Sequence, residues 1–358
     1  MSREEFVPKW IAWEITRRCN LKCVHCRSSS YLGAPEGGFS TAEALKLIDD
    51  IAGYAKPVLV LSGGEPLMRP DVWDLAAHGT ARGLRMCLAT NGVLVDDAAC
   101  ARMKETGIRM VSLSLDGASA PVHDDFRQQP GAFDATVRAT ERLKAHGIPF
   151  LVNSSFTKRN QDEIPKIYRL AKELGATAWY MFLIVPTGRG AEILNELVTA
   201  EDYNRILDWH YETEKGEDDL LMRPTCAPHY YRIVLEKNRG RPPEDKLQRR
   251  SLTFSTGGGK GCIAGQTICL IDCFGEVHPC SYMAASGGNV KVTPFREIWE
   301  RSPLFQELRD FTRYQGRCGS CEYLNVCGGC RARAEAIHGD RLAEEPFCDY
   351  VPRKLREA

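Results

Sequence analysis

Short apolar runs, rich in β-branched and aromatic residues, alternate with amphipathic stretches along the first half of the chain. Within the amphipathic stretches apolar residues recur at helical spacing, and the runs between them have the length and composition of buried strands. We predict strands at 11–15, 57–61, 86–90, 110–115, 149–154 and 178–184. We predict helices near 40–53, 71–82, 97–106, 131–146, 161–174 and 200–213.

Strands that alternate with helices favour an α/β fold in which a parallel sheet has right-handed crossovers. The first helix has a marked start, because Ser40 and Glu43 have the spacing of a capping box. A curved, partial (β/α)6 barrel and an open doubly wound sheet both fit this pattern.

We divide the chain into a core at 1–222, a linker or bridging segment at 223–260, and a small cysteine-rich domain at 261–358. The stretch 240–261 is rich in Pro, Gly and charge, which is typical of a linker or mobile loop. Beyond it, regular apolar patterns are too few for a large core, so we expect metal clusters to hold this part together.

Composition narrows the function classes. Hydrophobic residues make up 43% of the 358 residues, yet no apolar run is long enough to span a membrane. Lys plus Arg equals Asp plus Glu at 47 each, so no net charge attracts nucleic acid or anionic lipid. The N-terminus resembles no secretory signal, and 15 cysteines in a chain of this size indicate metal or redox chemistry. We therefore expect a cytoplasmic protein with no nucleic-acid or membrane partner.

Three cysteines follow the first predicted strand, at Cys19, Cys23 and Cys26. We call them the N-terminal triplet. Three thiolates can each hold one iron of a [4Fe–4S] cube and leave the fourth iron free for a small molecule. The alternative is a zinc knuckle or a chance cluster, although structural zinc prefers four ligands.

Polar and glycine-rich motifs follow the next three predicted strands. Residues 62–66 read Ser-Gly-Gly-Glu-Pro, residues 90–92 read Thr-Asn-Gly, and residues 114–117 read Ser-Leu-Asp-Gly. Each alone is typical of a turn. Together with the triplet they would meet at the carboxyl edge of a parallel sheet, where α/β folds keep their active sites.

This convergence indicates a site for an organic ligand. Gly63 and Gly64 would let a ligand approach the backbone, Glu65 could bind an ammonium group, and Ser114 with Asp116 could hold hydroxyls. A protein that only carries electrons needs no such site.

Residues 10–190, with the triplet and Gly-Gly-Glu-Pro, resemble the radical S-adenosylmethionine (SAM) enzymes. The resemblance implies that the free iron of the triplet's cluster chelates SAM and that the glycine motif holds its amino group. It implies cleavage of SAM to methionine and a 5′-deoxyadenosyl radical, with an external electron donor such as a flavodoxin or ferredoxin. We expect the SAM site to include His25, Gly63, Gly64, Glu65, Asn91, Ser114 and Asp116.

The cysteines beyond position 260 resemble the SPASM auxiliary-cluster domain found in many radical SAM enzymes. By that resemblance Cys262, Cys280 and Cys330, the first auxiliary set, hold one [4Fe–4S] cluster. The second auxiliary set would hold another, giving three clusters in all, and consists of Cys318, Cys321, Cys327 and Cys348.

The chain departs from this family in one place. Four of these cysteines lie close together in the sequence, at 318–330. The family usually has three residues between the last two cysteines of this block, whereas here only Gly328 and Gly329 separate Cys327 from Cys330. The alternative for residues 318–330 is a structural zinc site, which would leave the flanking cysteines without a role.

We expect the fourth ligand of the first auxiliary cluster to be Cys269. Residues 267–279 read as a hairpin, and a two-residue turn at Phe274-Gly275 would place Cys269 opposite Cys280, with Cys273 too near the tip. A three-residue turn would direct Cys269 to the other face of the hairpin. A vacant fourth position is the rival.

Narrower resemblance links residues 8–19, 225–231 and 327–334 to the tetrapyrrole-modifying branch of the family. It implies that iron-coproporphyrin III is the substrate and that two propionates become vinyls, giving heme b. The alternatives are didecarboxysiroheme conversion, heme d1 formation, or peptide modification. Cys226, His229 and Tyr230 could line the tetrapyrrole site or ligate its iron.

Overall fold

The computed structural model describes residues 6–35, 38–238 and 260–356. The strands are β1 (Trp10–Thr16), β2 (Val58–Gly63), β3 (Arg85–Thr90), β4 (Val111–Ser114), β5 (Phe150–Phe156), β6 (Ala178–Leu183), β7 (Leu221–Thr225), β8 (Ile268–Ile271) and β9 (Val277–His278). The longer helices are α1 (Thr41–Tyr54), α2 (Val72–Ala81), α3 (Asp97–Glu105), α4 (Ala120–Arg127), α5 (Ala132–Ala145), α6 (Ile164–Leu174), α7 (Ala200–Gly216), α8 (His229–Lys237) and α13 (Arg331–His338). Shorter helices are α10 (Phe295–Arg301), α11 (Pro303–Arg309), α12 (Gly316–Gly319) and α14 (Arg353–Arg356), with 3-10 turns η2 (Pro66–Met68), η3 (Gln161–Glu163), η4 (Gly188–Glu196) and η5 (Phe311–Arg313).

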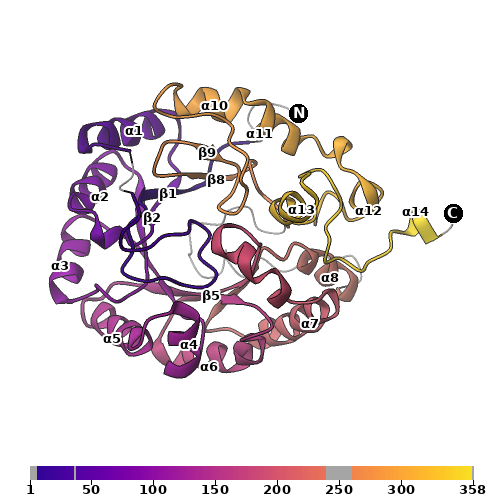
Figure 1. The fold of residues 1–358 in the computed structure, drawn as a ribbon, viewed down its shortest axis with the longest axis horizontal. Coiled ribbons are helices and arrows are strands. Elements are labelled where there is room, and N and C mark those ends of the chain that lie inside the picture. Colours follow the sequence, from indigo (N-terminus) through magenta and orange to yellow (C-terminus); the bar gives the residue numbers. More distant parts are fainter. Residues whose placement is uncertain (1–5, 36–37, 239–259, 357–358) are drawn as a thin grey trace.

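The nine strands form one curved sheet in the order β7-β6-β5-β4-β3-β2-β1-β8-β9. All neighbouring pairs are parallel except β8 and β9. Strands β1 to β7 therefore follow one another in chain order, and Figure 1 shows α1 to α7 around the outside of the curve. A doubly wound sheet would reverse its strand order. The partial barrel is confirmed, and all six predicted strands and six predicted helices lie within a few residues of those observed.

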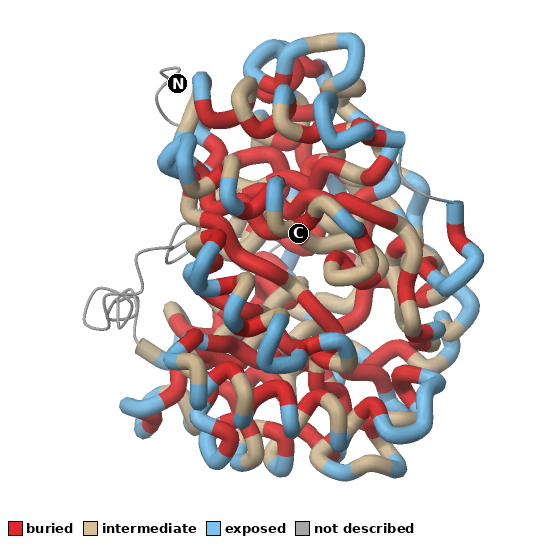
Figure 2. The backbone as a smooth tube through the Cα atoms, turned by 90° about the vertical axis from the view of Figure 1, so that its left-hand side faces the viewer, coloured by how far each residue is buried: buried red, intermediate tan, exposed pale blue. Residues whose placement is uncertain are grey.

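The hydrophobic core fills the space between the sheet and its helices, and Figure 2 shows buried backbone inside and exposed turns outside. The C-terminal part contributes to this same core through Phe295, Trp299 and Phe305, all fully buried. This part therefore has more apolar core than the sequence indicated, and the role of metal clusters in holding it together stays a prediction. Helices α10 and α11 are short, which hid their apolar periodicity in the sequence.

The bridging segment predicted at 223–260 is partly regular structure. Its first residues complete β7, which pairs with β6, and α8 follows with Tyr230, Ile233 and Val234 buried. Pro224 is compatible with β7 because an edge strand tolerates a proline, and Pro228 directly precedes α8. The predicted linker at 240–261 lies almost entirely outside the described residues.

The β8–β9 hairpin has a three-residue turn instead of the predicted two-residue turn. Ile271 pairs with Val277, and the Asp272 amide donates to the Glu276 carbonyl at 2.9 Å. Cys269 therefore does not face Cys280. It lies beside Ile11 of β1, fully buried in the main core, so the geometric argument for Cys269 as a cluster ligand is wrong.

No helix in the described part of the chain is both long and apolar enough to cross a membrane.

The ends of β1 and β2 approach each other unusually closely. The amide of Gly64 donates to the carbonyl of Thr16 at 2.9 Å, and the amide of Glu65 donates to that of Arg18 at 2.8 Å. A Cβ on Gly64 would lie 2.1 Å from the Arg18 carbonyl oxygen. Gly63 and Gly64 are therefore required because a side chain at either position would clash with the backbone of Thr16 or Arg18. This close contact holds the chain in place directly before Cys19.

We expect Gly64→Ala to destabilise the fold by about 1–3 kcal/mol, because the added methyl must displace backbone atoms that cannot rotate away. The matched control is Gly53→Ala in α1, where an added Cβ meets nothing within 4 Å and should stabilise by about 0.5–1 kcal/mol. Thermal unfolding measures both. Equal stability of Gly64→Ala and the unchanged protein would contradict this account.

Candidate active site

Four loops meet at the carboxyl edge of the sheet, as predicted. The N-terminal triplet follows β1, the Gly-Gly-Glu-Pro motif ends β2, Asn91 follows β3 and Asp116 follows β4. Because these strands are parallel neighbours, their loops share one edge. Ser114 ends β4 with a half-buried side chain, beside Asn153 of β5.

The triplet forms a small cluster of its own, in which Cys19 and Cys23 are buried and Cys26 is half-buried. Each thiol accepts a hydrogen bond from nitrogen: Cys19 from the Leu21 amide at 3.4 Å, Cys26 from the Ser30 amide at 3.4 Å, and Cys23 from Arg127 Nη1 at 3.7 Å. Burial raises the pKa of the Cys19 thiol to about 12. These sulfurs suit a metal cluster, since metal binding keeps thiolates deprotonated and N–H···S bonds tune cluster potentials.

Glu65 is fully buried, and its carboxylate is occupied by the chain itself. It accepts hydrogen bonds from the Thr90 hydroxyl at 2.8 Å, the Asn91 amide at 2.8 Å and the Leu67 amide at 3.2 Å. Burial raises the pKa of this carboxyl to about 7. A carboxylate can accept about four hydrogen bonds, so the expected contact between Glu65 and an ammonium group stays a prediction. Glu65 also ties the β2 loop to the β3 loop.

Asn91 reaches back to the triplet. Its side-chain amide donates to Asn20 Oδ1 at 2.7 Å and lies 3.8 Å from Cys19 Sγ. Its oxygen accepts from the Val93 amide at 3.0 Å. Asn91 therefore positions the loop of the first cysteine.

Asp116 is fully buried and paired with Arg127, whose Nη2 lies 2.6 Å from Asp116 Oδ2. The other oxygen accepts from the Ser155 amide at 2.7 Å, and the expected contact of Asp116 with a ligand hydroxyl stays a prediction. Arg127 Nη1 in turn donates to Cys23 Sγ at 3.7 Å. Burial raises the pKa of Asp116, opposed by Arg127.

Arg127 is a site residue that the sequence analysis missed. It ends α4, a helix that was not predicted, and lies 104 residues from Cys23 along the chain. His25 lies in the same group, with its ring 4.6 Å from that of Phe126 and its Nε2 3.6 Å from Asp116. Burial lowers the pKa of His25 well below its usual range, so the ring is neutral.

The second auxiliary set lines a single cavity, together with His229, Arg232 and Glu345. Arg331 Nη2 donates to Cys318 Sγ at 3.4 Å, and the Glu345 amide donates to the same sulfur at 3.3 Å. The structure therefore gathers the four cysteines that the resemblance grouped.

Gly328 and Gly329 explain the short spacing between Cys327 and Cys330. Both have positive φ, at 70° and 60°, which glycine adopts without steric cost. This turn lets the Cys327 side chain enter the cavity of the second auxiliary set while Cys330 packs beside Cys280 and Cys226.

The first auxiliary set lies against a fourth cysteine that was not assigned to it. Cys226 and Cys280 pack in one small cluster with Cys330, and the charge of Cys330 also acts on the Cys262 thiol. Interaction between the two neighbouring thiols lowers the pKa of Cys330 to about 7 and raises that of Cys226.

His229 and Tyr230 lie away from the catalytic edge. His229 lines the cavity of the second auxiliary set, and the Tyr230 hydroxyl bonds to Glu214 of α7. Within the described ranges, no three His, Cys, Asp or Glu side chains converge on a position for a single metal ion. A cube spreads its ligands over four irons, so its cysteines need not converge in this way.

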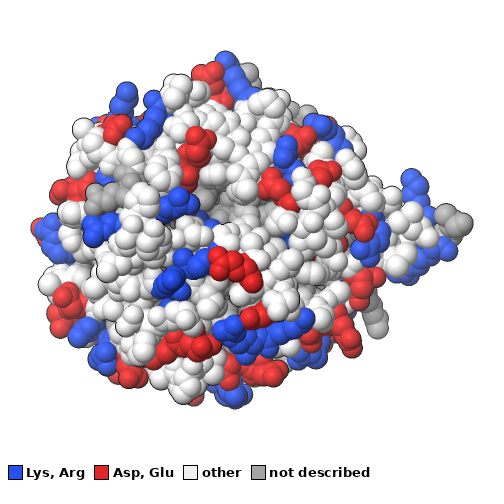
Figure 3. Space-filling model, viewed as in Figure 1, with Lys and Arg blue, Asp and Glu red and all other residues white. Residues whose placement is uncertain are grey.

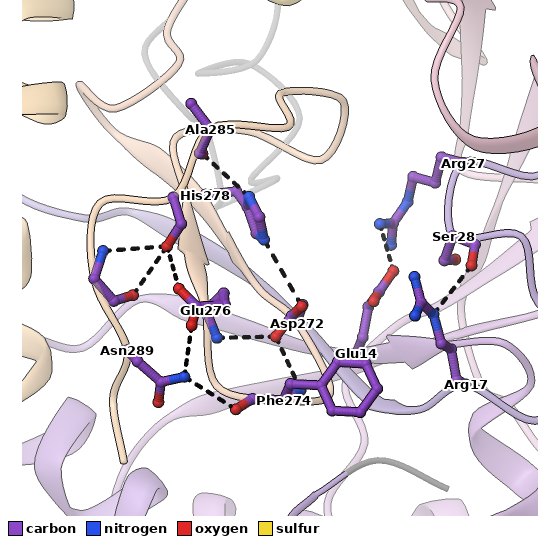
Figure 4. Close-up of polar contacts among 12 residues, drawn as sticks. Glu14, Arg17, Arg27, Ser28, Asp272, Phe274, Glu276, His278, Ala285 and Asn289 are labelled. Atoms are coloured by element: carbon purple, nitrogen blue, oxygen red, sulfur yellow. Dashed lines mark hydrogen bonds and ion pairs between the residues drawn. The ribbon is translucent and has the colours of Figure 1, made fainter. Parts of the chain in front are cut away.

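The face in Figure 3 is hollowed at its centre, where the loop after β1 faces the β8–β9 hairpin. Figure 4 shows the polar groups there. Arg27 pairs with buried Glu14 at 2.6 Å, and the Arg17 guanidinium stacks over the Phe274 ring at 5.5 Å. His278 bonds to the Ala285 carbonyl at 3.1 Å; burial would lower its pKa, but Asp272 raises it overall.

Comparison with known proteins follows the same division of the chain. Residues 13–171 match the radical SAM superfamily, and residues 262–331 match SPASM, an iron–sulfur cluster-binding domain. The structure of Streptococcus suis SuiB bound to S-adenosylmethionine shares the fold, with a TM-score of 0.73 at 17% identity, covering 97% of this chain and 78% of SuiB.

Two curated relatives are similar along nearly their whole length. An AdoMet-dependent heme synthase of Methanosarcina barkeri is 46% identical over 347 residues, covering 97% of this chain and 98% of the relative. An Fe-coproporphyrin III synthase of the same organism is 35% identical over 368 residues, covering 96% and 88%. The chain is therefore a radical SAM enzyme with a C-terminal SPASM domain, and it belongs to the family that contains the AdoMet-dependent heme synthases.

Proposed function

We propose that this enzyme decarboxylates two propionates of iron-coproporphyrin III to vinyls and so makes heme b. The observation that carries the proposal is the 46% identity to an AdoMet-dependent heme synthase over almost the full chain, against 35% to the Fe-coproporphyrin III synthase. By its name, the second relative makes the compound that we propose as substrate. Didecarboxysiroheme conversion and heme d1 formation are the neighbouring alternatives.

The proposed cofactors are SAM and three [4Fe–4S] clusters, one on the N-terminal triplet and one on each auxiliary set. SAM bound at the triplet's cluster supplies a 5′-deoxyadenosyl radical that abstracts hydrogen. Each propionate then loses one hydrogen atom, one electron and CO₂, so the site needs an electron acceptor. The auxiliary sets supply thiols for such an acceptor, and a flavodoxin or ferredoxin would supply the reducing electron.

The chain's own residues fix the geometry for this chemistry. Gly64 and Glu65 hold the β2 loop against the triplet loop, and Asn91 orients Cys19. Arg127 places positive charge 3.7 Å from Cys23, where an anionic cluster would lie. Because Asp116 holds Arg127 from the other side, this charge is fixed in position.

The hollow offers a cation to a substrate rich in carboxylates. Arg17 is half-buried, donates Nε to the Ser28 carbonyl at 3.2 Å, and lies two residues before Cys19. Among the described residues no carboxylate lies within ion-pair distance of Arg17. Its guanidinium could therefore bind a propionate without breaking an existing pair.

The proposed reaction is tested by anaerobic turnover with products read by mass spectrometry. Iron-coproporphyrin III should lose two CO₂ and become heme, and 5′-deoxyadenosine should accumulate. The control is the triple variant Cys19→Ala, Cys23→Ala, Cys26→Ala, which should make no 5′-deoxyadenosine yet keep most of its iron absorbance. Conversion of didecarboxysiroheme instead would assign the enzyme to the neighbouring branch.

Replacing Arg17 tests the carboxylate site. We expect Arg17→Gln to raise KM for the tetrapyrrole roughly 10- to 100-fold, since hydrogen bonds to charged groups contribute about 1.5–3 kcal/mol. SAM cleavage without substrate should change little. Arg102→Gln, on α3 and 44% exposed, is the control. An unchanged KM for Arg17→Gln would remove Arg17 from the substrate site.

Replacing Arg127 separates its electrostatic role from its structural one. Arg127→Met should destabilise the fold by about 3–5 kcal/mol, because Asp116 is left buried and unpaired. It should also lower the potential of the triplet's cluster, since a nearby positive charge favours reduction. The double variant Arg127→Met, Asp116→Asn should recover stability but not potential, as measured by EPR-monitored titration. Recovery of both would show that Arg127 acts only on the fold.

A further inference from the structure

The proposed cluster on the first auxiliary set has three assigned thiols, which leaves one iron without a ligand. The two cysteines of the hairpin do not fill this position. Cys269 lies in the main core beside Ile11. Cys273 lies at the hairpin tip, where its carbonyl accepts from the Gly38 amide and the charges of Glu14, Asp272 and Arg17 act on its thiol.

Cys226 lies where a fourth ligand is needed. It packs with Cys280, Cys330 and Met283 in a small hydrophobic cluster separate from the main core. Cys262 lies near this group, because its amide donates to the Cys327 carbonyl at 2.9 Å and the charge of Cys330 acts on its thiol.

The backbone of Cys226 is held in an uncommon conformation. Its φ is 58°, in the left-handed region, which costs a residue with a side chain about 1–2 kcal/mol. Such a residue persists only where its surroundings impose the conformation, and these positions cluster at functional sites. Here the residue joins the end of β7 to the turn before α8.

A buried ion pair imposes this position. Arg333 is fully buried and donates Nη2 to the Cys226 carbonyl at 2.8 Å. Its Nη1 lies 3.1 Å from Glu345 Oε1, and the other oxygen of Glu345 accepts from the Cys330 amide at 2.7 Å. The pair thus fixes the backbones of Cys226 and Cys330 relative to each other and places a positive charge beside their sulfurs.

We propose that Cys226 is the fourth thiolate ligand of the first auxiliary cluster, completing the set of Cys262, Cys280 and Cys330. This inference rests on the auxiliary cluster proposed above. With four thiolates the cluster has no open iron, so neither the tetrapyrrole nor its propionates coordinate it. Its role is then to transfer electrons, and the triplet's cluster alone binds an organic ligand.

The test compares Cys226→Ala with the matched control Cys269→Ala in the full chain, reconstituted anaerobically and saturated with SAM. SAM occupies the open iron of the triplet's cluster, so any iron that binds added cyanide belongs to an auxiliary cluster. In the unchanged protein and in Cys269→Ala, cyanide should leave the EPR spectrum of the reduced clusters unaltered. In Cys226→Ala we expect either a cyanide-dependent spectrum or the loss of about one iron per chain.

Two further variants make every outcome decisive. Cys226→Ser keeps an oxygen ligand, so it should retain its iron while its Mössbauer spectrum shows one altered iron, even if the alanine variant folds poorly. Cys280→Ala reports on the cluster itself, and unchanged iron content there would overturn the proposed cofactor set as well. If Cys226→Ala binds no cyanide and keeps its iron while Cys280→Ala loses iron, only the ligand assignment is overturned. Cyanide binding by the auxiliary clusters of the unchanged protein would also overturn the ligand assignment.

Discussion

Positive charge buried beside thiols is the constraint on which the rest of this structure depends. A cube held by thiolates is an anion, and an anion in a dry interior needs paired or hydrogen-bonded compensation. Arg127 lies at Cys23 and Arg331 lies at Cys318, while Arg333 holds the carbonyl of Cys226. Asp116 and Glu345 hold Arg127 and Arg333 in turn, so these cations cannot turn away from the sulfurs.

The second constraint is the continuity of the sheet. Strand β8 pairs in parallel with β1, so the cysteine-rich part of the chain extends the barrel instead of forming a separate body. Helices α10 and α11 bury Trp299 and Phe305 in the common core and fix this arrangement. The β8–β9 hairpin therefore faces the loop after β1 across the hollow, and Arg17 of that loop lies over the Phe274 ring of the hairpin (Figure 4).

Several residues have a different role from the one that their type suggests. Glu65 and Asp116 carry carboxylates suited to a ligand, and both are fully buried and hold neighbouring loops together. Gly63 and Gly64 make room for the backbone of Thr16 and Arg18. These motif residues shape the loops around the cofactor site.

The sequence by itself determined the strands of the barrel, the shared edge of the four motifs and the grouping of the second auxiliary set. Local periodicity decides the elements, and parallel pairing brings their ends together whatever the details of packing. Only the tertiary structure decided which side chains meet across long separations. Arg127 reaches Cys23 from an unpredicted helix, and Cys226 reaches Cys330 across 104 positions. The β8–β9 turn has one residue more than the sequence analysis predicted. Side chains alternate between the two faces of a strand, so this shift of one position turns Cys269 toward the core.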